Sequence, residues 1–421
     1  MRKISILVGF AVLAVSGTAR ASEKAEDVPT FAKDVAPIFY ESCVSCHREN
    51  HIAPMSLMTY EDSRPWARAI KQKVEAREMP PWGAAHGIQQ YANDQSLSSE
   101  AIATISAWVD GGAPRGNPSD LPDAPQFADG WSIGEPDLVF TMVEPYDVPP
   151  DGTIPYLYIT VPTNLTEDIW ISATEYRPGD KRVVHHVIPD VKQGNGEPVD
   201  PSPKLARDRA KKSIPGATVG GFVPNRRGRT FPDGVASRIP AGAEIEAQMH
   251  YTSIGIPVTD QSSWGVVLTK EPLENLRETG GGQVADMRFA IPPHDGNHEV
   301  RAVRRIKSDT LLANMMPHMH VRGKDAKYTL RYPDGREEVV LWVPNYDFNW
   351  QLRYELAEPI LMPAGSELEV VMHFDNSANN KYNPDPSAEV RFGEQTWEEM
   401  MIGFYGTVDV GSAEKKTTSN N

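Results

Sequence analysis

Apolar and polar residues follow two different patterns along the chain. Between residues 31 and 112, apolar side chains recur every three to four positions, as they do on one face of a helix. The stretches with this spacing are 31–40, 64–78 and 98–109. Ser98 is a typical helix N-cap, and Gly111 and Gly112 are typical of a helix end. This part of the chain is therefore expected to form a small all-α domain.

From about residue 127 the pattern changes to short runs in which apolar and polar residues alternate. The clearest of these runs are 156–161, 169–173, 244–251 and 367–374. They are separated by Pro, Gly and Asp, and the whole chain contains 36 Pro and 32 Gly, which favours many turns. Short strands with frequent turns are typical of antiparallel β-sandwiches. The chain beyond residue 127 is long enough for two of them.

The expected fold class is therefore multidomain: a small all-α domain followed by two all-β antiparallel sandwiches, jelly-roll-like in form. A chain of 421 residues is too long for a single hydrophobic core. Residues 117–126 have the Pro- and Asp-rich composition of a linker, and residues 411–421 form a polar tail that is expected to be disordered.

The first 21 residues have the three parts of a secretory signal peptide. A basic start, Arg2-Lys3, precedes an apolar run at 4–15, and Ala19-Arg20-Ala21 resembles a cleavage site. The apolar run is too short to span a bilayer, which takes roughly 20 apolar residues. We expect residues 1–21 to be removed and the protein to be periplasmic or secreted, without a membrane span. The alternative is an uncleaved N-terminal anchor.

Charge excludes two classes of partner. Removal of three basic residues with the signal peptide leaves 39 Lys and Arg against 57 Asp and Glu, a net charge of −18. Such a chain repels nucleic acid and anionic lipid, so neither is expected to bind.

The chain has two cysteines, Cys43 and Cys46, and they stand in the sequence Cys-x-x-Cys-His. This is the attachment motif of c-type haem, in which the two thiols bind the haem vinyl groups and His47 binds the iron. The alternative is a thioredoxin-like redox pair, which needs a βαβ context that the sequence lacks. We therefore expect one covalently attached haem c and interpret residues 22–116 as a cytochrome c domain.

The second axial ligand of the iron is expected to be a thioether or another imidazole. Met79 is the preferred candidate, because the prolines after it favour an extended loop rather than a helix. The other candidates are Met55, Met58, His51 and His86.

The β region contains three further histidine motifs. His318 and His320 are two residues apart, so on a strand both point to the same face and can bind one metal. His185 and His186 are adjacent, so they need a bulge or a strand end to do the same. His250 stands in a third run. A single histidine on a strand is more often a hydrogen-bonded structural residue, so each motif alone is weak evidence for a metal site.

The order of the motifs along the chain is a more specific signal than any one motif alone. His-His, His-Tyr and His-x-His are followed by Gly323-Lys324 and by Glu398-Glu399-Met400. This order resembles the copper type II, ascorbate-dependent monooxygenases, the family of dopamine β-monooxygenase and peptidylglycine α-hydroxylating monooxygenase. The resemblance covers about two thirds of the chain, 127–410. It includes Ile-Pro-Pro at 291–293 and the segment 346–351.

The resemblance implies two copper ions, one in each of two β-sandwiches, 127–275 and 276–410, that face each other across a wet cleft. The electron-transfer copper would have the ligands His185, His186 and His250. The copper that binds dioxygen would have the ligands His318, His320 and Met400. Independently, a thioether among the ligands favours Cu(I) over zinc. The implied reaction hydroxylates a C–H bond of a small organic substrate with dioxygen and consumes two electrons.

The sequence departs from this family at several positions. Met372 and Met401 stand where relatives have cysteines, which implies apolar packing in place of a disulfide. Met316 replaces an Arg that holds the substrate carboxylate in the amidating members, and Ile402 and Phe404 replace an Asn and a Tyr beyond the Met ligand, which implies a more apolar substrate pocket. His294 replaces a common Gly, and His373 has no counterpart and is expected to be structural or to lie around a metal site.

The family takes its electrons from ascorbate, whereas a haem domain precedes the copper domains here. We expect the haem to pass electrons to the copper ions, from an ascorbate-like reductant or a redox protein; the alternative is that this domain serves docking or an unrelated redox partner. Two other functions remain open for the whole chain. One is a non-catalytic electron-transfer or copper-binding protein. The other is a zinc hydrolase, which is disfavoured because no His-Glu-x-x-His spacing is present.

Overall fold

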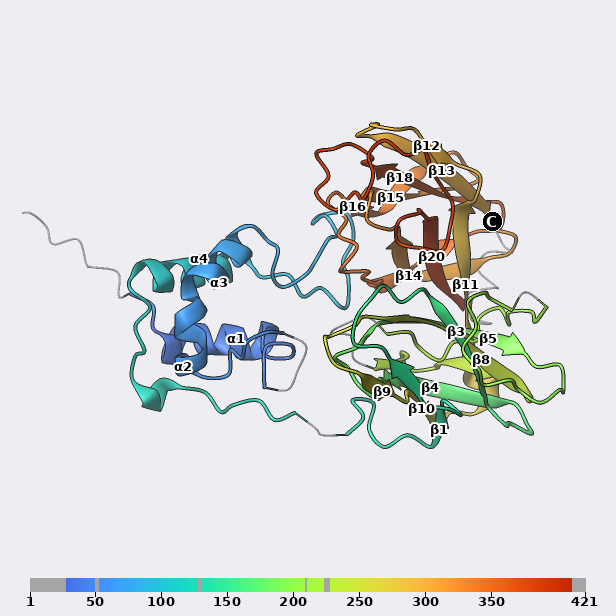
Figure 1. Ribbon diagram of the computed structural model, residues 1–421, viewed down its shortest axis with the longest axis horizontal. Helices are drawn as coiled ribbons and strands as arrows, with labels where there is room; N and C mark the ends of the chain where they lie inside the picture. Colours follow the sequence, from blue (N-terminus) through green and yellow to red (C-terminus); the bar gives the residue numbers. More distant parts are fainter. Residues whose placement is uncertain (1–27, 50–52, 128–129, 209, 223–227, 411–421) are drawn as a thin grey trace, which may run out of the picture.

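The computed structural model describes residues 28–49, 53–127, 130–208, 210–222 and 228–410, in an N-terminal region with helices beside two groups of strands (Figure 1). The predicted signal peptide, the predicted tail and His51 lie outside the described residues. No helix among the residues described is long and apolar enough to cross a membrane.

The N-terminal region contains short helices around a small apolar core. Their bounds are η1 Phe31–Val35, α1 Ala36–Ser42, α2 Tyr60–Ser63, η2 Arg64–Trp66, α3 Ala67–Glu75, α4 Ser99–Asp110 and η3 Pro118–Asp120. The Ser98 side chain accepts a hydrogen bond from the Ala101 amide and caps α4, as the sequence predicted. Phe39 packs edge-on against Trp108 in the core of this region.

The expected fold class is wrong for this part of the chain. Strands make up 37% of the structure and helices only 12%, and no all-α cytochrome c domain is evident among the described residues. The α-helices have seven, four, nine and 12 residues. The physical reason is that helix breakers interrupt the helical spacing: Pro65 lies in a 3-10 turn, and Pro80-Pro81 begins a long segment that leaves the helices.

The strands form two β units. The first contains β1 Leu138–Thr141, β2 Tyr146–Val148, β3 Leu157–Pro162, β4 Ile169–Arg177, β5 Val184–Gln193, β6 Arg229–Thr230, β7 Val235–Ile239, β8 Ala243–Tyr251, β9 Val258–Asp260 and β10 Ser263–Leu268. The second contains η4 Leu273–Asn275, β11 Arg277–Asp286, β12 Ala290–Ile291, β13 His298–Arg305, β14 Thr310–His318, β15 Gly323–Arg331, β16 Glu337–Val343, β17 Tyr354–Met362, β18 Glu367–Phe374, β19 Val390–Arg391 and β20 Met401–Asp409. The four strand runs expected from alternation correspond to β3, β4, β8 and β18.

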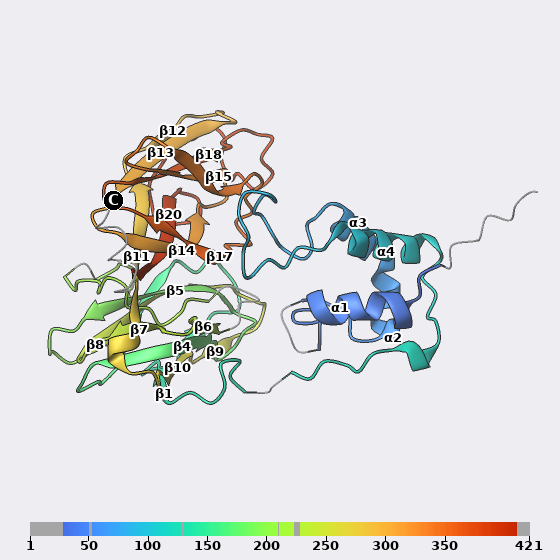
Figure 2. The same cartoon turned by 180° about the vertical axis from the view of Figure 1, so that it is seen from behind.

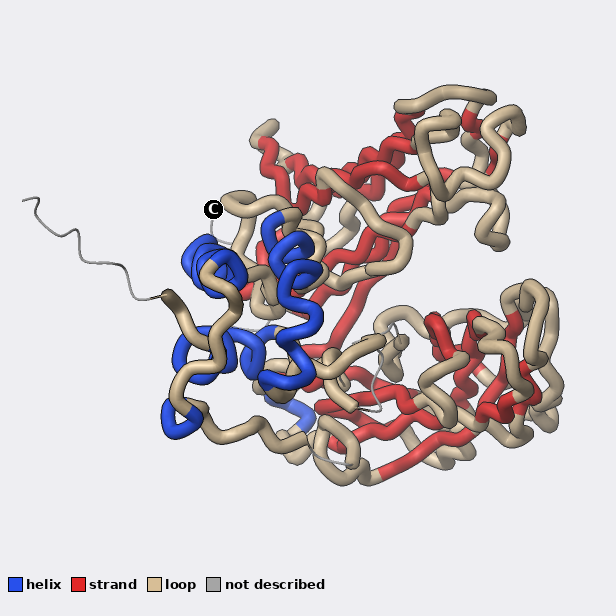
Figure 3. The backbone as a smooth tube through the Cα atoms, turned by 60° about the vertical axis from the view of Figure 1, so that its left-hand side comes forward, coloured by secondary structure: helices blue, strands red, loops and turns tan. Residues whose placement is uncertain are grey.

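One long sheet runs through both units. Its order is β1-β10-β4-β7-β11-β20-β14-β17, with β6 beside β4. The two halves are joined by β7 and β11, which pair in parallel, whereas their other neighbours in the sheet are antiparallel. Apolar side chains of the first half pack against the sheet β3-β8-β5, and those of the second half pack against β13-β18-β15-β16. Each unit is therefore a β-sandwich with its own core (Figure 3).

Residues 82–93, which we call the strap, join the N-terminal region to the second β unit (Figure 2). The Ala85 amide donates to the Trp342 carbonyl, and the Ala92 amide donates to the Glu355 carbonyl, both at 2.8 Å. The rings of Trp82 and Tyr91 pack edge-on against Tyr354 at 5.1 and 5.7 Å. The strap is therefore part of the core of the second unit although its sequence lies among the helices.

Candidate functional site: two histidine clusters

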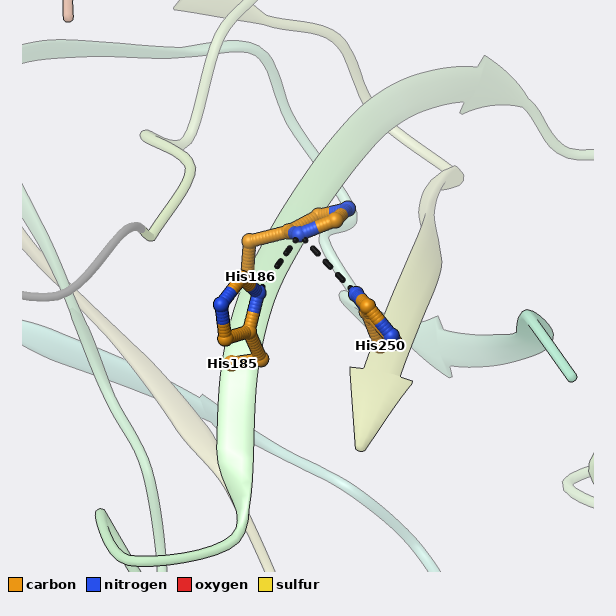
Figure 4. Close-up of side chains that lie close together, drawn as sticks. All are labelled: His185, His186 and His250. Carbon is orange, nitrogen blue, oxygen red and sulfur yellow. Dashed lines mark hydrogen bonds between the residues drawn. The ribbon is translucent and has the colours of Figure 1, made fainter. Parts of the chain in front are cut away.

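The first cluster consists of His185, His186 and His250. His186 on β5 is the direct partner of His250 on β8, so the antiparallel ladder places their side chains together. The register of β5 shifts between Val184 and His186, which is the bulge that the adjacent histidines were expected to need. The bulge brings His185 to the same side (Figure 4).

The Nδ1 atoms of the first cluster converge. His186 Nδ1 lies 3.2 Å from His185 Nδ1 and 3.2 Å from His250 Nδ1 (Figure 4). Three ligand atoms, one from each ring, lie within 4.8 Å of one another. Three imidazole nitrogens this close fit the ligand sphere of a copper or zinc ion.

Burial keeps these imidazoles uncharged. Together with a smaller contribution from the neighbouring histidines, it lowers the pKa of His186 well below its usual value and that of His250 to about 4. The Tyr156 ring packs edge-on against His186 at 5.5 Å and against His250 at 4.8 Å. A neutral imidazole is the form that binds metal, so the cluster has its lone pairs available at neutral pH.

The second cluster contains His318 and His320 at the end of β14. Their rings lie 5.3 Å apart at 86°, while Met319 between them is buried in the core. The Tyr346 hydroxyl donates to the Met319 carbonyl at 2.8 Å and holds this backbone in place. Gly323 permits the close approach, because a Cβ there would lie 2.6 Å from Met319 Cβ and 2.8 Å from the Tyr346 ring. The strand itself ends at His318, so the two rings lie side by side although His320 stands just beyond β14.

The second cluster offers its Nε2 atoms. His318 Nδ1 lies 2.6 Å from Gln351 Oε1, and His320 Nδ1 lies 3.1 Å from the Glu398 carbonyl. An oxygen acceptor fixes the proton on Nδ1 and leaves the lone pair on Nε2. His320 Nε2 is buried without a hydrogen-bond partner, and burial lowers the pKa of His320 to about 3. Both rings therefore have a metal-binding atom free.

The segment containing Met400 lies beside His320. His318 pairs with Ile402, so the approaching strand places Met400 next to the end of β14. The buried Glu399 carboxylate accepts from the amides of His320 and Met400, at 2.7 and 3.3 Å. Met400 is buried as well. Two imidazoles and a thioether are a donor set suited to copper that is reduced during its cycle.

Phe348 lies between the two clusters. Its ring stacks on His185 with centroids 6.5 Å apart and meets His320 edge-on at 6.0 Å. The two β units also touch near the clusters, where the Tyr158 hydroxyl on β3 donates to Glu394 Oε2 at 3.0 Å. The two candidate metal sites thus face each other at the junction of the units.

The haem-attachment motif follows α1. The amides of Cys46 and His47 donate to the Cys43 carbonyl at 3.1 and 3.0 Å, so the motif forms one tight turn. His47 Nδ1 lies 3.3 Å from the Met55 carbonyl, which leaves Nε2 as the ring nitrogen that could bind a metal. Burial, with a smaller contribution from Cys46, raises the pKa of the Cys43 thiol to about 12. A redox-active Cys-x-x-Cys pair has a lowered thiol pKa instead.

The candidates for the second axial ligand separate into two groups. Met55 and Met58 pack against the helical core. Met79, after α3, and His86 in the strap instead line a cavity between the N-terminal region and the second β unit. His47 is not among the residues lining that cavity, and Met55 contacts His47 through its backbone carbonyl.

The other residues marked by the sequence have structural surroundings. His373 Nδ1 lies 2.8 Å from Asp325 Oδ1 across neighbouring strands, which is a structural pairing. His294 has a φ of 61°, the left-handed conformation that favours glycine. Met372 and Met401 are fully buried in the same core.

Sequence reasoning did not assign a role to three residues that shape the site. Gln351 and Phe348 lie in the loop between β16 and β17, and Glu399 lies beside Met400. The signal was present, because residues 346–351 and Glu398-Glu399-Met400 were among the motifs of the resemblance. What they contact depends on the fold, since Gln351 and His318 are 33 residues apart.

No protein-family model and no curated protein matches the chain. Among solved structures, allantoicase is 11% identical over 55% of this chain and 79% of its own, with a TM-score of 0.18. The infectious bursal disease virus Gx strain is 9% identical over 67% and 82%, with a TM-score of 0.18. The PBCV-1 virus capsid is 8% identical over 65% and 95%, with a TM-score of 0.21. No argument about this chain rests on likenesses with TM-scores this low.

Proposed function

We propose that the chain is an exported copper- and haem-dependent monooxygenase that resembles the copper type II, ascorbate-dependent enzymes. It would hydroxylate a C–H bond of a small organic substrate. The observation that carries this proposal is the pair of histidine clusters that offer different ring nitrogens and meet at Phe348. A hydroxylation needs two electrons, and two copper sites that face each other can supply one each.

The residues of each cluster fit the proposed ligands. In the first cluster, His185, His186 and His250 would hold copper through Nδ1. In the second, His318 and His320 would hold it through Nε2, with Met400 as the soft third ligand. Bound copper would supply one-electron transfer and the activation of dioxygen. The overall reaction uses dioxygen, two electrons and two protons, and it places one oxygen atom in the product and the other in water.

The surroundings of the second cluster favour an apolar substrate. The Phe404 ring lies 6.2 Å from the His318 ring, and Ile402 is buried beside it. Met316 pairs with Phe404 across the same two strands. These side chains exclude water and offer no charge to a substrate carboxylate, so they suit an apolar C–H bond.

Electrons would enter through a haem bound to Cys43 and Cys46, one at a time, from an ascorbate-like reductant or a redox protein. His47 would be its first axial ligand, because the Met55 carbonyl holds the other ring nitrogen. Both haem attachment and the predicted signal peptide suit a periplasmic or secreted protein.

The experiment that tests the proposal measures copper, zinc and haem in the mature protein, produced with cytochrome c maturation and supplied with copper. We expect two copper ions per haem, and one in the His318→Ala, His320→Ala double variant. Zinc in these sites, or iron alone, would contradict the proposal.

A second variant separates a monooxygenase from a non-catalytic electron-transfer protein. Met400→Ala should abolish hydroxylation and leave reduction of the haem intact. Met401→Leu is the matched control, because it changes a neighbouring buried methionine that faces the apolar core. Substrate turnover that survives in Met400→Ala would show that the oxygen site is assigned wrongly.

A further inference from the structure

The cavity between the N-terminal region and the second β unit has a volume of about 1320 Å³. On one side its wall includes Met79, Val74 and Leu97. Val74 and Leu97 belong to the helical core against which Cys43 also packs, so this wall and the Cys-x-x-Cys-His motif share one apolar core. On the opposite side the wall is formed by the loop between β16 and β17, including Tyr346 and Phe348.

Phe348 is the residue of this wall that also touches both histidine clusters. Its ring stacks on His185 and meets His320 edge-on, at 6.5 and 6.0 Å. The loop is held on both sides of Phe348: Tyr346 is hydrogen-bonded to Met319, and Gln351 Nε2 donates to the Phe348 carbonyl at 3.4 Å. The position of the ring is therefore fixed by the same residues that order the second cluster.

We infer that Phe348 is the contact through which electrons pass from the N-terminal region to the two clusters. The inference rests on the proposed function and adds the path that the electrons take from the N-terminal region to the copper sites. In each transfer one electron leaves ferrous haem and reduces Cu(II) to Cu(I), the haem becomes ferric, and no bond forms or breaks. Because one ring touches both clusters, a single entry point serves the two copper ions. Phe348 acts as a positioning residue for this transfer, since it touches the histidines and not the substrate.

The test uses the full chain loaded with haem and copper, without oxygen or substrate. A light flash with a flavin photoreductant delivers one electron to the haem, and its ferrous absorbance band then reports reoxidation by Cu(II). In the native protein we expect reoxidation at a rate independent of protein concentration, as an intramolecular transfer requires. Phe348→Leu should slow it several-fold, with copper and haem content unchanged, and Phe348→Tyr should restore the native rate because it keeps the ring.

Trp350→Leu is the matched control. Trp350 lines the same cavity from the same loop, but no ring contact joins it to the histidines among the described residues, so the native rate is expected. A native rate in Phe348→Leu, or equal slowing in Trp350→Leu, would overturn the inference. Metal analysis before the flash distinguishes this failure from that of the proposed function: absence of copper or haem in the native protein would refute both, whereas full copper and haem content with a native rate in Phe348→Leu would refute the inference alone.

Discussion

The two histidine clusters reach similar compositions by different means. In the first cluster, His186 and His250 are paired residues of neighbouring strands, and a bulge adds His185. Their Nδ1 atoms converge directly. In the second cluster, both histidines come from one strand end, and oxygen acceptors from two other segments hold their Nδ1 atoms. Backbone register therefore builds the first cluster, whereas tertiary contacts build the second.

This difference determines which substitutions should damage each site. The first cluster depends on the ladder between β5 and β8, whose residues lie in the core of the first unit. Removal of a ring there takes away one of the three ligand atoms that the cluster offers. The second cluster depends on Gln351 and on the 398–400 segment, so changes outside the ligand set should weaken it. The predictions below test this contrast.

The largest effect is expected for His250→Ala. This substitution removes one of three converging nitrogens, so the first copper should be lost while the second remains. Metal analysis should give one copper per haem in place of two. The electron paramagnetic resonance spectrum of Cu(II) should keep only the signal of the second site.

The control for this prediction is His373→Gln. His373 also stands on a β-strand, but it pairs with Asp325 and not with other histidines. Both copper ions should remain in this variant. Full copper content in His250→Ala would mean that the first cluster is not a metal site.

A smaller effect is expected for Gln351→Leu. It removes the acceptor that keeps the His318 proton on Nδ1, and loss of such a partner costs about 10–100-fold in metal affinity. Titration against a chelator should show this loss at the second site only. Gln351→Glu keeps an oxygen acceptor and should bind copper more tightly than Gln351→Leu does.

Asn349→Ala is the matched control in the same loop. The Asn349 side chain bonds to Asp347 on the surface and touches neither cluster, so native affinity is expected. Native copper affinity in Gln351→Leu would show that the ring of His318 is held by packing alone.

Local pattern predicted the elements of this fold better than their assembly. The runs that became β3, β4, β8 and β18 alternate clearly, and Ser98 caps α4 as its sequence suggests. The all-α class failed because helical spacing persists for only a few turns before prolines interrupt it. The strap could not be predicted, since its place is set by Tyr354 in a core formed more than 250 residues later.

The candidate site was predictable where chemistry is local. His318-x-His320 needed only strand geometry, and the bulge at His185 followed from the adjacency of two histidines. The acceptors of the second cluster were not predictable, because a glutamine or a backbone carbonyl carries no sequence signal for its partner. The cavity shared with the N-terminal region depends in the same way on how separate units pack.

The smallest effect is expected at the contact that holds the clusters opposite each other. The Tyr158 hydroxyl donates to Glu394 across the two units and accepts from Gln248. Tyr158→Phe removes this buried hydroxyl and its hydrogen bonds, which should lower the free energy of unfolding by about 1 kcal/mol. For units of this size that is roughly 2–4 °C in Tm, measurable by calorimetry. Both copper ions should stay bound, because neither cluster loses a ligand or an acceptor.

Tyr332→Phe provides the comparison, since Tyr332 also donates to a glutamate, Glu338, but within the second unit and in a partly exposed position. Its loss should cost less, because water replaces the bond on the surface. An unchanged Tm in Tyr158→Phe would mean that the shared sheet through β7 and β11 alone fixes the units. Backbone pairing would then place the two clusters opposite each other, just as backbone pairing between β5 and β8 builds the first cluster.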